Sequence, residues 1–294
     1  MEKNKITTGH LIVAVAGVAL FTIMALSPDT NIVTENTGSI NIATIKKAVV
    51  PEDGIILPID WSDLGRKMTE AGVIDKVKFE ALYARRGGLS KEEMKLLDSI
   101  DNGEVTINRE NSAVLLNLLW AFGLSNKNEI LEKGPMVDEK YGGDAGKFAS
   151  TGGWTLSVGD SMDHYSKYEF VTLTKEQQAL VERVSKNIYR PCCGNSTHFP
   201  DCNHGMAMLG LIELLASQDI SEEEIYDIAL VVNSYWFPDT YLTLAEYFRQ
   251  RGTDWADVDP KEVLGTKYSS GRGYSKILEE MEPTTIQKGA GCGV

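Results

Sequence analysis

Two segments of the chain are apolar almost all round, and they constrain the fold more than any other feature of the sequence. Residues 112–123 read SAVLLNLLWAFG, and residues 203–217 form a second apolar run of helical length. A helix that is hydrophobic on every side has no face suited to water and is therefore buried. We expect a buried central helix at 112–123 and another apolar helix at 203–217.

Shorter amphipathic runs with helix-capping residues flank these segments. Ser90 is followed three residues later by Glu93, and Ser221 by Glu224. Each pair matches the capping box, in which two side chains bond to the free N–H groups at a helix start. Further helices are expected at 62–71, 75–85, 174–189, 238–252 and 274–281. Because helices do not alternate with strands, the sequence predicts a mainly α, multi-helix fold.

Changes in composition divide the chain into six regions. Residues 134–160 are rich in glycine and proline, which predicts an irregular junction between two helical lobes. The expected regions are a membrane anchor or signal segment at 1–27, a spacer with one or two short strands at 28–58, a helical lobe at 59–133, an irregular connector at 134–173, a second helical lobe at 174–285 and a flexible Gly/Cys tail at 286–294.

The N-terminal segment is typical of a membrane anchor. Residues 11–26 carry no charge and follow a weakly basic start with Lys3 and Lys5. As a helix they span roughly 24 Å, slightly less than the ~30 Å hydrocarbon core, and flanking residues extend this length. An uncleaved anchor is favoured over a cleaved signal peptide, because the residues before Ala25 match a cleavage site poorly. Both interpretations place the bulk of the chain outside the cytoplasm, in a periplasmic or extracellular position.

The charge balance excludes one class of partner. The chain has 42 acidic residues against 29 Lys and Arg, a formal net charge of −13. A nucleic-acid-binding protein needs a basic face to neutralise phosphates, and no basic run occurs here. The expected partners are a metal ion, the membrane through the N-terminal helix, and an envelope protein, with no nucleic acid.

Five metal-ligand residues lie within thirteen positions. They are Cys192, Cys193, His198, Cys202 and His204, in a loop shaped by prolines and glycine between two expected helices. Thiolate and neutral imidazole are ligands of Zn²⁺, and thiolate with thioether suits Cu(I). The sequence therefore predicts a Cu(I) or Zn²⁺ site in which Cys192, Cys193, Cys202 and His204 are the first ligands and His198 the next.

The helix after the loop favours ionisation of one of these thiols. Asp201 or Asn203 can cap a helix that begins near residue 203. This places Cys202 and His204 at the helix N-terminus, where the helix dipole favours a thiolate and lowers its pKa.

Five further residues are secondary candidates for the site. Met206 and Met208 lie one helical turn after Cys202 and His204, although methionines at this spacing more often pack in a core. Glu213 falls on the same helical stripe, where a carboxylate can support or bind a metal. Cys292 lies in the Gly-rich tail and can reach a site elsewhere or form an intermolecular disulfide. His164 follows Asp163 and is either a metal ligand or a polar loop residue.

The cysteines also permit other interpretations. In an oxidising compartment clustered cysteines are most often disulfides, and Cys202 can pair with Cys192 or Cys193. The function classes that stay open are a metal-binding protein, a thiol-redox enzyme that uses Cys202, and a disulfide-stapled interaction scaffold. Whether the protein is an enzyme therefore stays open.

A faint local resemblance supports an exported protein. The residues that carry it are Pro191-Cys192-Cys193-Gly194, then His198, then Asp201-Cys202 with His204-Gly205. They resemble the bacterial PCYCGC-motif proteins, which are exported and membrane-tethered. The resemblance covers about fifteen of the 294 residues, and here no aromatic residue separates the two cysteines and no cysteine follows the glycine. It implies an extracytoplasmic metal or redox role.

A hydrolase interpretation is the least favoured. Residues 155–162 look like a strand followed by a Gly-Asp-Ser turn, which is similar to the nucleophile element of GDSL-type hydrolases. The resemblance implies Ser161 as nucleophile and Asp201 with His204 as the Asp-x-x-His pair. The helical residues between them do not match the strand–helix alternation of that fold.

Overall fold

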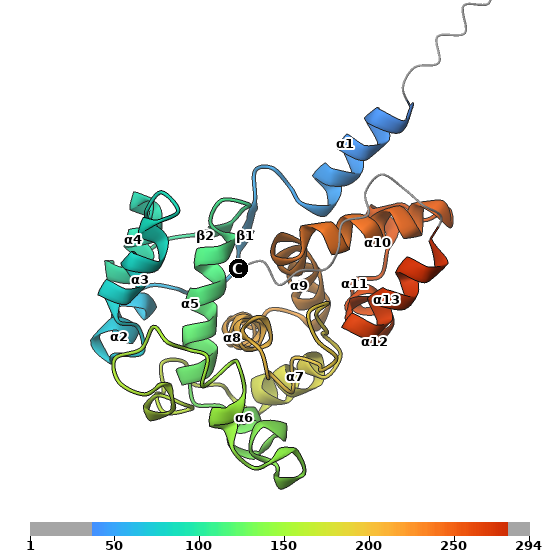
Figure 1. The fold of residues 1–294 in the computed structure, drawn as a ribbon. Coiled ribbons are helices and arrows are strands. Elements are labelled where there is room, and N and C mark those ends of the chain that lie inside the picture. Colours follow the sequence, from blue (N-terminus) through green and yellow to red (C-terminus); the bar gives the residue numbers. More distant parts are fainter. Residues whose placement is uncertain (1–36, 282–294) are drawn as a thin grey trace, which may run out of the picture. The chain divides into compact units, whose positions relative to one another are not determined.

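The two apolar segments form the two central helices of the structure, a computed structural model that describes residues 37–281. Helices α5 (Ser112–Ser125) and α8 (Asn203–Ser217) are buried along nearly their whole length and pack directly against each other (Figure 1). A Cβ on Gly123 would lie 2.2 Å from the carbonyl oxygen of Met206, and one on Gly210 would lie 2.6 Å from that of Leu119. Glycine at both positions lets the backbones approach closely. The prediction of buried central helices is confirmed.

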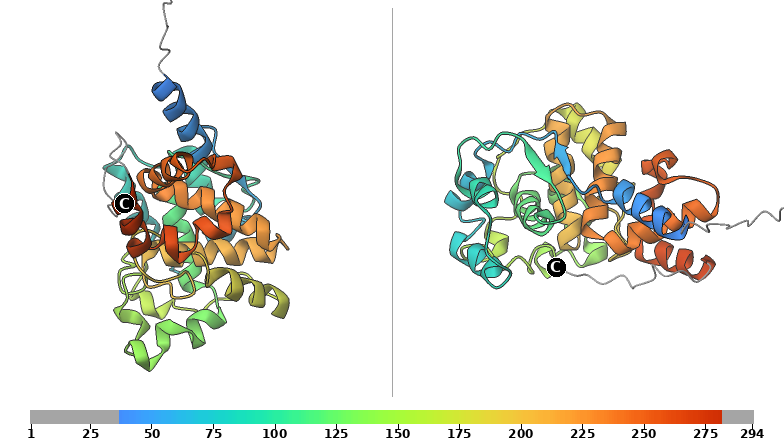
Figure 2. Two further views of the ribbon diagram at one scale, coloured as in Figure 1. Left: turned by 90° about the vertical axis from the view of Figure 1, so that its right-hand side faces the viewer. Right: turned by 90° about the horizontal axis from the view of Figure 1, so that it is seen from above.

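Within the described residues six elements precede α5, and α2 among them contacts α5 directly. They are α1 (Thr37–Val49), β1 (Ile55–Leu57), α2 (Leu64–Glu70), α3 (Lys76–Ala84), α4 (Lys91–Asp98) and β2 (Val105–Ile107). β1 and β2 pair antiparallel, with Ile55 opposite Ile107, next to the start of α5 (Figure 2). The capping box of Ser90 and Glu93 at the start of α4 is confirmed. Helix α1 lies within the spacer expected at 28–58 and is not predicted from the sequence, because residues 37–49 lack a strong amphipathic pattern.

The chain between α5 and α7 is irregular. It contains α6 (Glu129–Lys133) and the single 3-10 turns η1 (Pro135–Val137), η2 (Glu139–Tyr141), η3 (Ala145–Lys147) and η4 (Ser161–Asp163). The strand expected before the Gly-Asp-Ser turn is wrong, because residues 155–158 form turns that bond to the end of α2 and the start of α3. Helices from both sides of this segment belong to one compact unit, and the domain boundaries stay a prediction.

Seven further elements make up the C-terminal half of the described residues besides α8. They are α7 (Lys175–Ser185), α9 (Glu222–Trp236), α10 (Pro238–Gln250), η5 (Trp255–Asp257), α11 (Pro260–Val263), α12 (Thr266–Ser269) and α13 (Gly271–Glu280). α7 and α9 contact α8 directly. Ser221 caps α9 by accepting from the Glu224 N–H, and Pro238 opens α10 as expected for a residue without an N–H. The predicted mainly helical class is confirmed.

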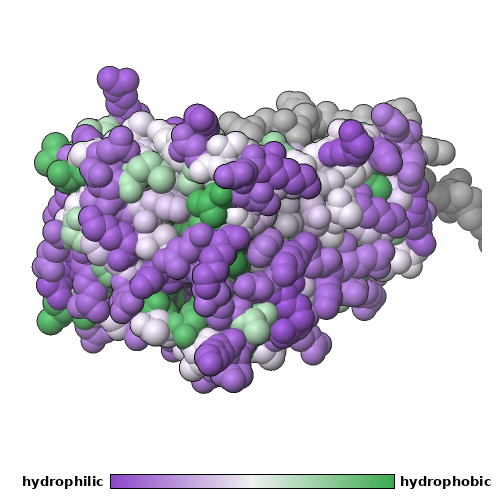
Figure 3. Space-filling view, turned by 90° about the horizontal axis from the view of Figure 1, so that it is seen from below, coloured by the Kyte–Doolittle hydropathy of each residue, from purple (hydrophilic) through white to green (hydrophobic). Residues whose placement is uncertain are grey.

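The face of the described part seen in Figure 3 is largely hydrophilic. Figure 3 shows one face on which apolar residues form small separate patches. Among residues 37–281, no helix is long and apolar enough to cross a bilayer. The expected anchor at 11–26 and the tail with Cys292 lie outside the described residues, so both stay predictions.

Candidate metal centre

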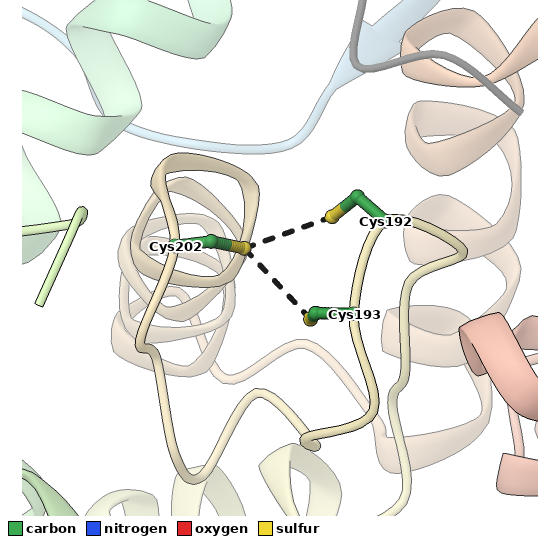
Figure 4. A group of neighbouring side chains, drawn as sticks. All are labelled: Cys192, Cys193 and Cys202. Atoms are coloured by element: carbon green, nitrogen blue, oxygen red, sulfur yellow. Dashed lines mark hydrogen bonds between the residues drawn. The ribbon is translucent and has the colours of Figure 1, made fainter.

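Three of the predicted ligands converge on one point. The Cys202 sulfur lies 3.7 Å from the Cys192 sulfur and 3.9 Å from the Cys193 sulfur, and all three sulfurs are within 4.8 Å of one another (Figure 4). All three thiols are free. Sulfur ligands with bonds of about 2.3 Å at a tetrahedral angle are roughly 3.8 Å apart. The two separations around Cys202 therefore match both the spacing of sulfurs that share one ion and a hydrogen-bond contact between thiols.

The start of α8 places Cys202 in this group. Cys202 is the N-cap residue of α8 and has an extended backbone, with no side chain capping the helix. The expected cap by Asp201 or Asn203 is wrong: Asp201 bonds elsewhere, and the Asn203 amide oxygen accepts from the N–H of the next residue. The predicted position of the Cys202 thiol at the positive end of the helix dipole is confirmed.

A buried arginine that the sequence analysis missed organises the loop. Arg190 is 1 % exposed, and its Nε donates to the Cys202 sulfur at 3.2 Å. Its Nη1 donates to the Asn195 carbonyl at 3.0 Å, and its Nη2 donates to the Phe199 carbonyl at 3.2 Å and to the Asp201 carboxylate at 2.7 Å. A guanidinium stays charged in a protein, so it sets a fixed positive charge beside the sulfurs.

A glycine makes room for this guanidinium. A Cβ on Gly205, in the first turn of α8, would lie 2.4 Å from Nη2 and 2.5 Å from Cζ of Arg190. Contacts this short do not occur between real atoms, so only glycine lets Arg190 lie against the helix. The signal in the sequence is Gly205 itself, since a glycine inside a helical run often marks a close approach by another group.

The electrostatics single out one of the three thiols. Hydrogen bonds from the thiols of Cys192 and Cys193 lower the pKa of Cys202, and Arg190 and His204 lower it further, which outweighs the opposing effect of burial. The pKa of Cys192 is raised by its contacts with Cys193 and Cys202 and by burial. Contact with Cys192 lowers the pKa of Cys193, but contact with Cys202 and burial raise it to about 11. Of the three thiols, Cys202 is therefore the one whose surroundings favour ionisation.

His204 lies beside the sulfur group without belonging to it. Its side chain is 3 % exposed and packs on Phe237, with ring centroids 4.4 Å apart. The imidazole is near enough to Cys202 to lower the thiol pKa, yet its Nδ1 has no hydrogen-bond partner among the described residues. A buried nitrogen without a partner carries a desolvation penalty, which a ligand at this position would relieve.

Three other predicted residues of the segment do not join the sulfurs. His198 lies in the same loop but outside the group, and burial lowers its pKa, with Lys186 adding to the effect. Met206 and Met208 are fully buried in the hydrophobic core. Their helical spacing reflects packing of α8, as the core interpretation of methionine predicts.

The structure also separates Glu213 and His164 from the cluster. Glu213 follows Cys202 by eleven residues in α8, roughly 16 Å along the helix axis. It is fully buried and accepts a hydrogen bond of 2.7 Å from Asn126, and burial raises its pKa to about 8. Both ring nitrogens of His164 bond within 2.9 Å, one to Tyr168 and one to the Val158 carbonyl. Neither residue faces the sulfurs.

The geometry does not support the hydrolase interpretation. The two Asp201 oxygens bond to Arg190 at 2.7 Å and to the Asn195 amide at 2.8 Å. Within the described chain, no hydrogen bond joins Asp201 to His204, whose Nδ1 stays without a partner. A catalytic triad requires that bond to orient the imidazole. The proposed Ser161–His204–Asp201 triad is therefore wrong.

Comparisons with known proteins do not assign this chain to a family. No protein-family model, curated protein or solved structure gives a significant match to this chain. The centre consists of three convergent sulfurs, one fixed cation and one buried imidazole without a partner. Chemically, this arrangement can hold a thiophilic ion or exchange disulfides.

Proposed function

We propose that this protein binds one thiophilic metal ion, Zn²⁺ or Cu(I), through the sulfurs of Cys192, Cys193 and Cys202. The observation that carries the proposal is the pair of sulfur separations, 3.7 and 3.9 Å, around Cys202. A disulfide requires about 2.05 Å, whereas sulfurs that share a metal lie roughly 3.8 Å apart.

The charge of the surroundings supports a cation bound by thiolates. Three thiolates with Zn²⁺ carry one net negative charge, and with Cu(I) they carry two. Arg190 is buried beside them with its Nε on the Cys202 sulfur, but it also pairs with the Asp201 carboxylate, so it compensates the charge of the sulfurs only in part. Uncompensated charge is costly in a partly buried site, so Zn²⁺ is the ion that the local charge balance favours.

We propose His204 as the fourth ligand of a zinc site. Structural zinc has four ligands, and three cysteines with one histidine are one of the common sets. His204 Nδ1 is buried, lacks a partner and belongs to a ring that already interacts with Cys202. Coordination to the ion would give this nitrogen its partner.

We also propose that the site lies outside the cytoplasm on a membrane-tethered chain. Support comes from the uncharged residues 11–26 behind Lys3 and Lys5. There the protein would carry or sense the ion, or hold it as a cofactor. In cells that produce the full chain, we expect it in the alkali-resistant membrane fraction and accessible to external protease. Recovery in the soluble fraction would contradict this placement.

Metal analysis of the full chain tests the binding proposal. The protein is purified without chelator and without a metal-affinity column, and its metal is measured by mass spectrometry together with its free thiols. We expect about one equivalent of zinc or copper, loss of the metal in Cys202→Ser and retention in the control Cys292→Ser. An equal metal content in wild type and Cys202→Ser, or free thiols without metal, would overturn the proposal.

A further inference from the structure

The same three sulfurs that we propose as metal ligands are also arranged to form a disulfide. We infer that a disulfide reagent joins Cys202 to Cys192 in a disulfide, leaves Cys193 as a free thiol and so releases the bound ion. The release rests on the proposed metal site, whereas the disulfide itself depends only on the positions of the cysteines.

Cys202 is the sulfur that every unstrained disulfide in this group must contain. The Cα atoms of adjacent residues are about 3.8 Å apart, whereas disulfides join Cα atoms about 4.4–6.8 Å apart. A bond between Cys192 and Cys193 would therefore be strained. The Cys202 sulfur lies within 3.9 Å of both, so it is the common member of the two remaining pairs.

The backbone distinguishes Cys192 from Cys193 as the partner. Forming a disulfide moves two sulfurs from 3.7 Å to about 2.05 Å, which requires one of them to shift. Cys193 is fixed on both sides: its N–H donates to the Arg190 carbonyl at 3.3 Å, and its carbonyl accepts from the Gly271 N–H at 2.8 Å. Within the described chain, no backbone hydrogen bond fixes Cys192. Cys192 is thus the residue that can move.

The reaction balances as thiol–disulfide exchange. The Cys202 sulfur attacks one sulfur of R–S–S–R, breaks that bond and forms a mixed disulfide, with R–S⁻ as leaving group. The Cys192 sulfur then attacks the Cys202 sulfur and expels the second R–S⁻. In the metal-bound protein two thiolates are oxidised to one disulfide and one external disulfide is reduced to two R–S⁻, which take their protons from solvent. The metal changes no oxidation state and loses two of its three sulfur ligands.

The arrangement of the sulfurs makes this exchange accessible. All three cysteines are partly exposed, so an external disulfide can reach them. Arg190 Nε donates to the Cys202 sulfur and holds it facing both neighbours. The site would therefore bind its ion only while Cys202 and Cys192 are reduced.

Oxidised glutathione added to the zinc-loaded full chain tests the inference. The Cys292→Ser background leaves only the three described cysteines. Released zinc is followed with a chromogenic chelator, intact mass shows the loss of two hydrogens, and peptide mapping locates the disulfide. We expect one zinc released per disulfide, a Cys192–Cys202 bond and an alkylatable Cys193. A lasting glutathione adduct on Cys202, or a Cys193–Cys202 bond, would overturn the inference.

Two matched variants separate this result from failure of the metal site. In the metal-free protein, Cys193→Ser should form the internal disulfide at the wild-type rate, whereas Cys192→Ser should accumulate the mixed disulfide at Cys202. Equal behaviour of the two variants would contradict the assignment of Cys192. If the wild type retains no metal but forms the Cys192–Cys202 bond, only the metal proposal fails.

Discussion

Replacing Gly205 with alanine tests how the centre is built. Gly→Ala inside a helix ordinarily stabilises by about 1 kcal/mol, since alanine loses less backbone entropy. Here the new methyl would lie 2.4 Å from Nη2 and 2.8 Å from Nε of Arg190, so the guanidinium must move by roughly 1 Å to reach van der Waals distance. That shift breaks its bonds to Asp201 and to the Cys202 sulfur, at 2.7 and 3.2 Å.

The magnitude follows from those two bonds. Hydrogen bonds to charged groups contribute about 1.5–3 kcal/mol each, and the helix gain offsets about 1 kcal/mol. We expect Gly205→Ala to lower the free energy of unfolding by about 2–5 kcal/mol in urea denaturation followed by circular dichroism. Gly194→Ala is the matched control from the same loop, because nothing lies within 4 Å of its Cβ position. A Gly205→Ala protein as stable as Gly194→Ala would refute this account of the loop.

Three other predictions concern the core and the ion. Burial raises the pKa of Glu213 from its ordinary value of 4.5 to about 8. Between these two pH values the folded protein holds a proton that the unfolded chain has lost, so the free energy of unfolding falls as pH rises, by at most about 4 kcal/mol at pH 8. Glu213→Gln should remove this pH dependence in urea titrations at pH 5 and pH 8, and an unchanged slope would contradict it. Gly210→Ala should lower the free energy of unfolding by about 1–3 kcal/mol in the same urea assay, because its Cβ would meet the Leu119 carbonyl at 2.6 Å and push α5 from α8. A urea midpoint equal to that of wild type would argue against it. Chelation of a zinc-loaded sample, at free zinc 100 times the Kd, should lower the free energy of unfolding by about 2.7 kcal/mol, whereas no shift on chelation would mean that the ion does not bind the folded state.

Local features of the sequence predict much of the helical framework. Residues 112–123 and 203–217 are buried helices because an apolar surface on every side leaves no other environment for them. Ser90 and Glu93 make a capping box because the interaction spans only four residues. One or two short strands are predicted within 28–58, and one is present as β1 (Ile55–Leu57). Helix α1 and the pairing of β1 with β2 are not predicted, because the pairing joins segments about fifty residues apart, which a local pattern does not contain.

Part of the candidate site can likewise be predicted from the sequence, and part of it cannot. The convergence of Cys192, Cys193 and Cys202 follows from a short loop that leads into a helix start, and it is visible in the sequence. Arg190 is missed because its role depends on a backbone approach at Gly205 and on carbonyls brought in by the loop. Glu213 lies on the same face of α8 as Cys202, as the sequence predicts. It does not reach the sulfurs, because a position around the helix takes no account of the rise along the helix axis.

X-ray absorption at the metal edge of the loaded full chain tests the central claim most directly. The account predicts three sulfur neighbours at about 2.3 Å, with one nitrogen from His204 if the ion is zinc. A shell of nitrogen and oxygen neighbours without sulfur would show that the ion binds elsewhere and would contradict a metal centre at Cys192, Cys193 and Cys202.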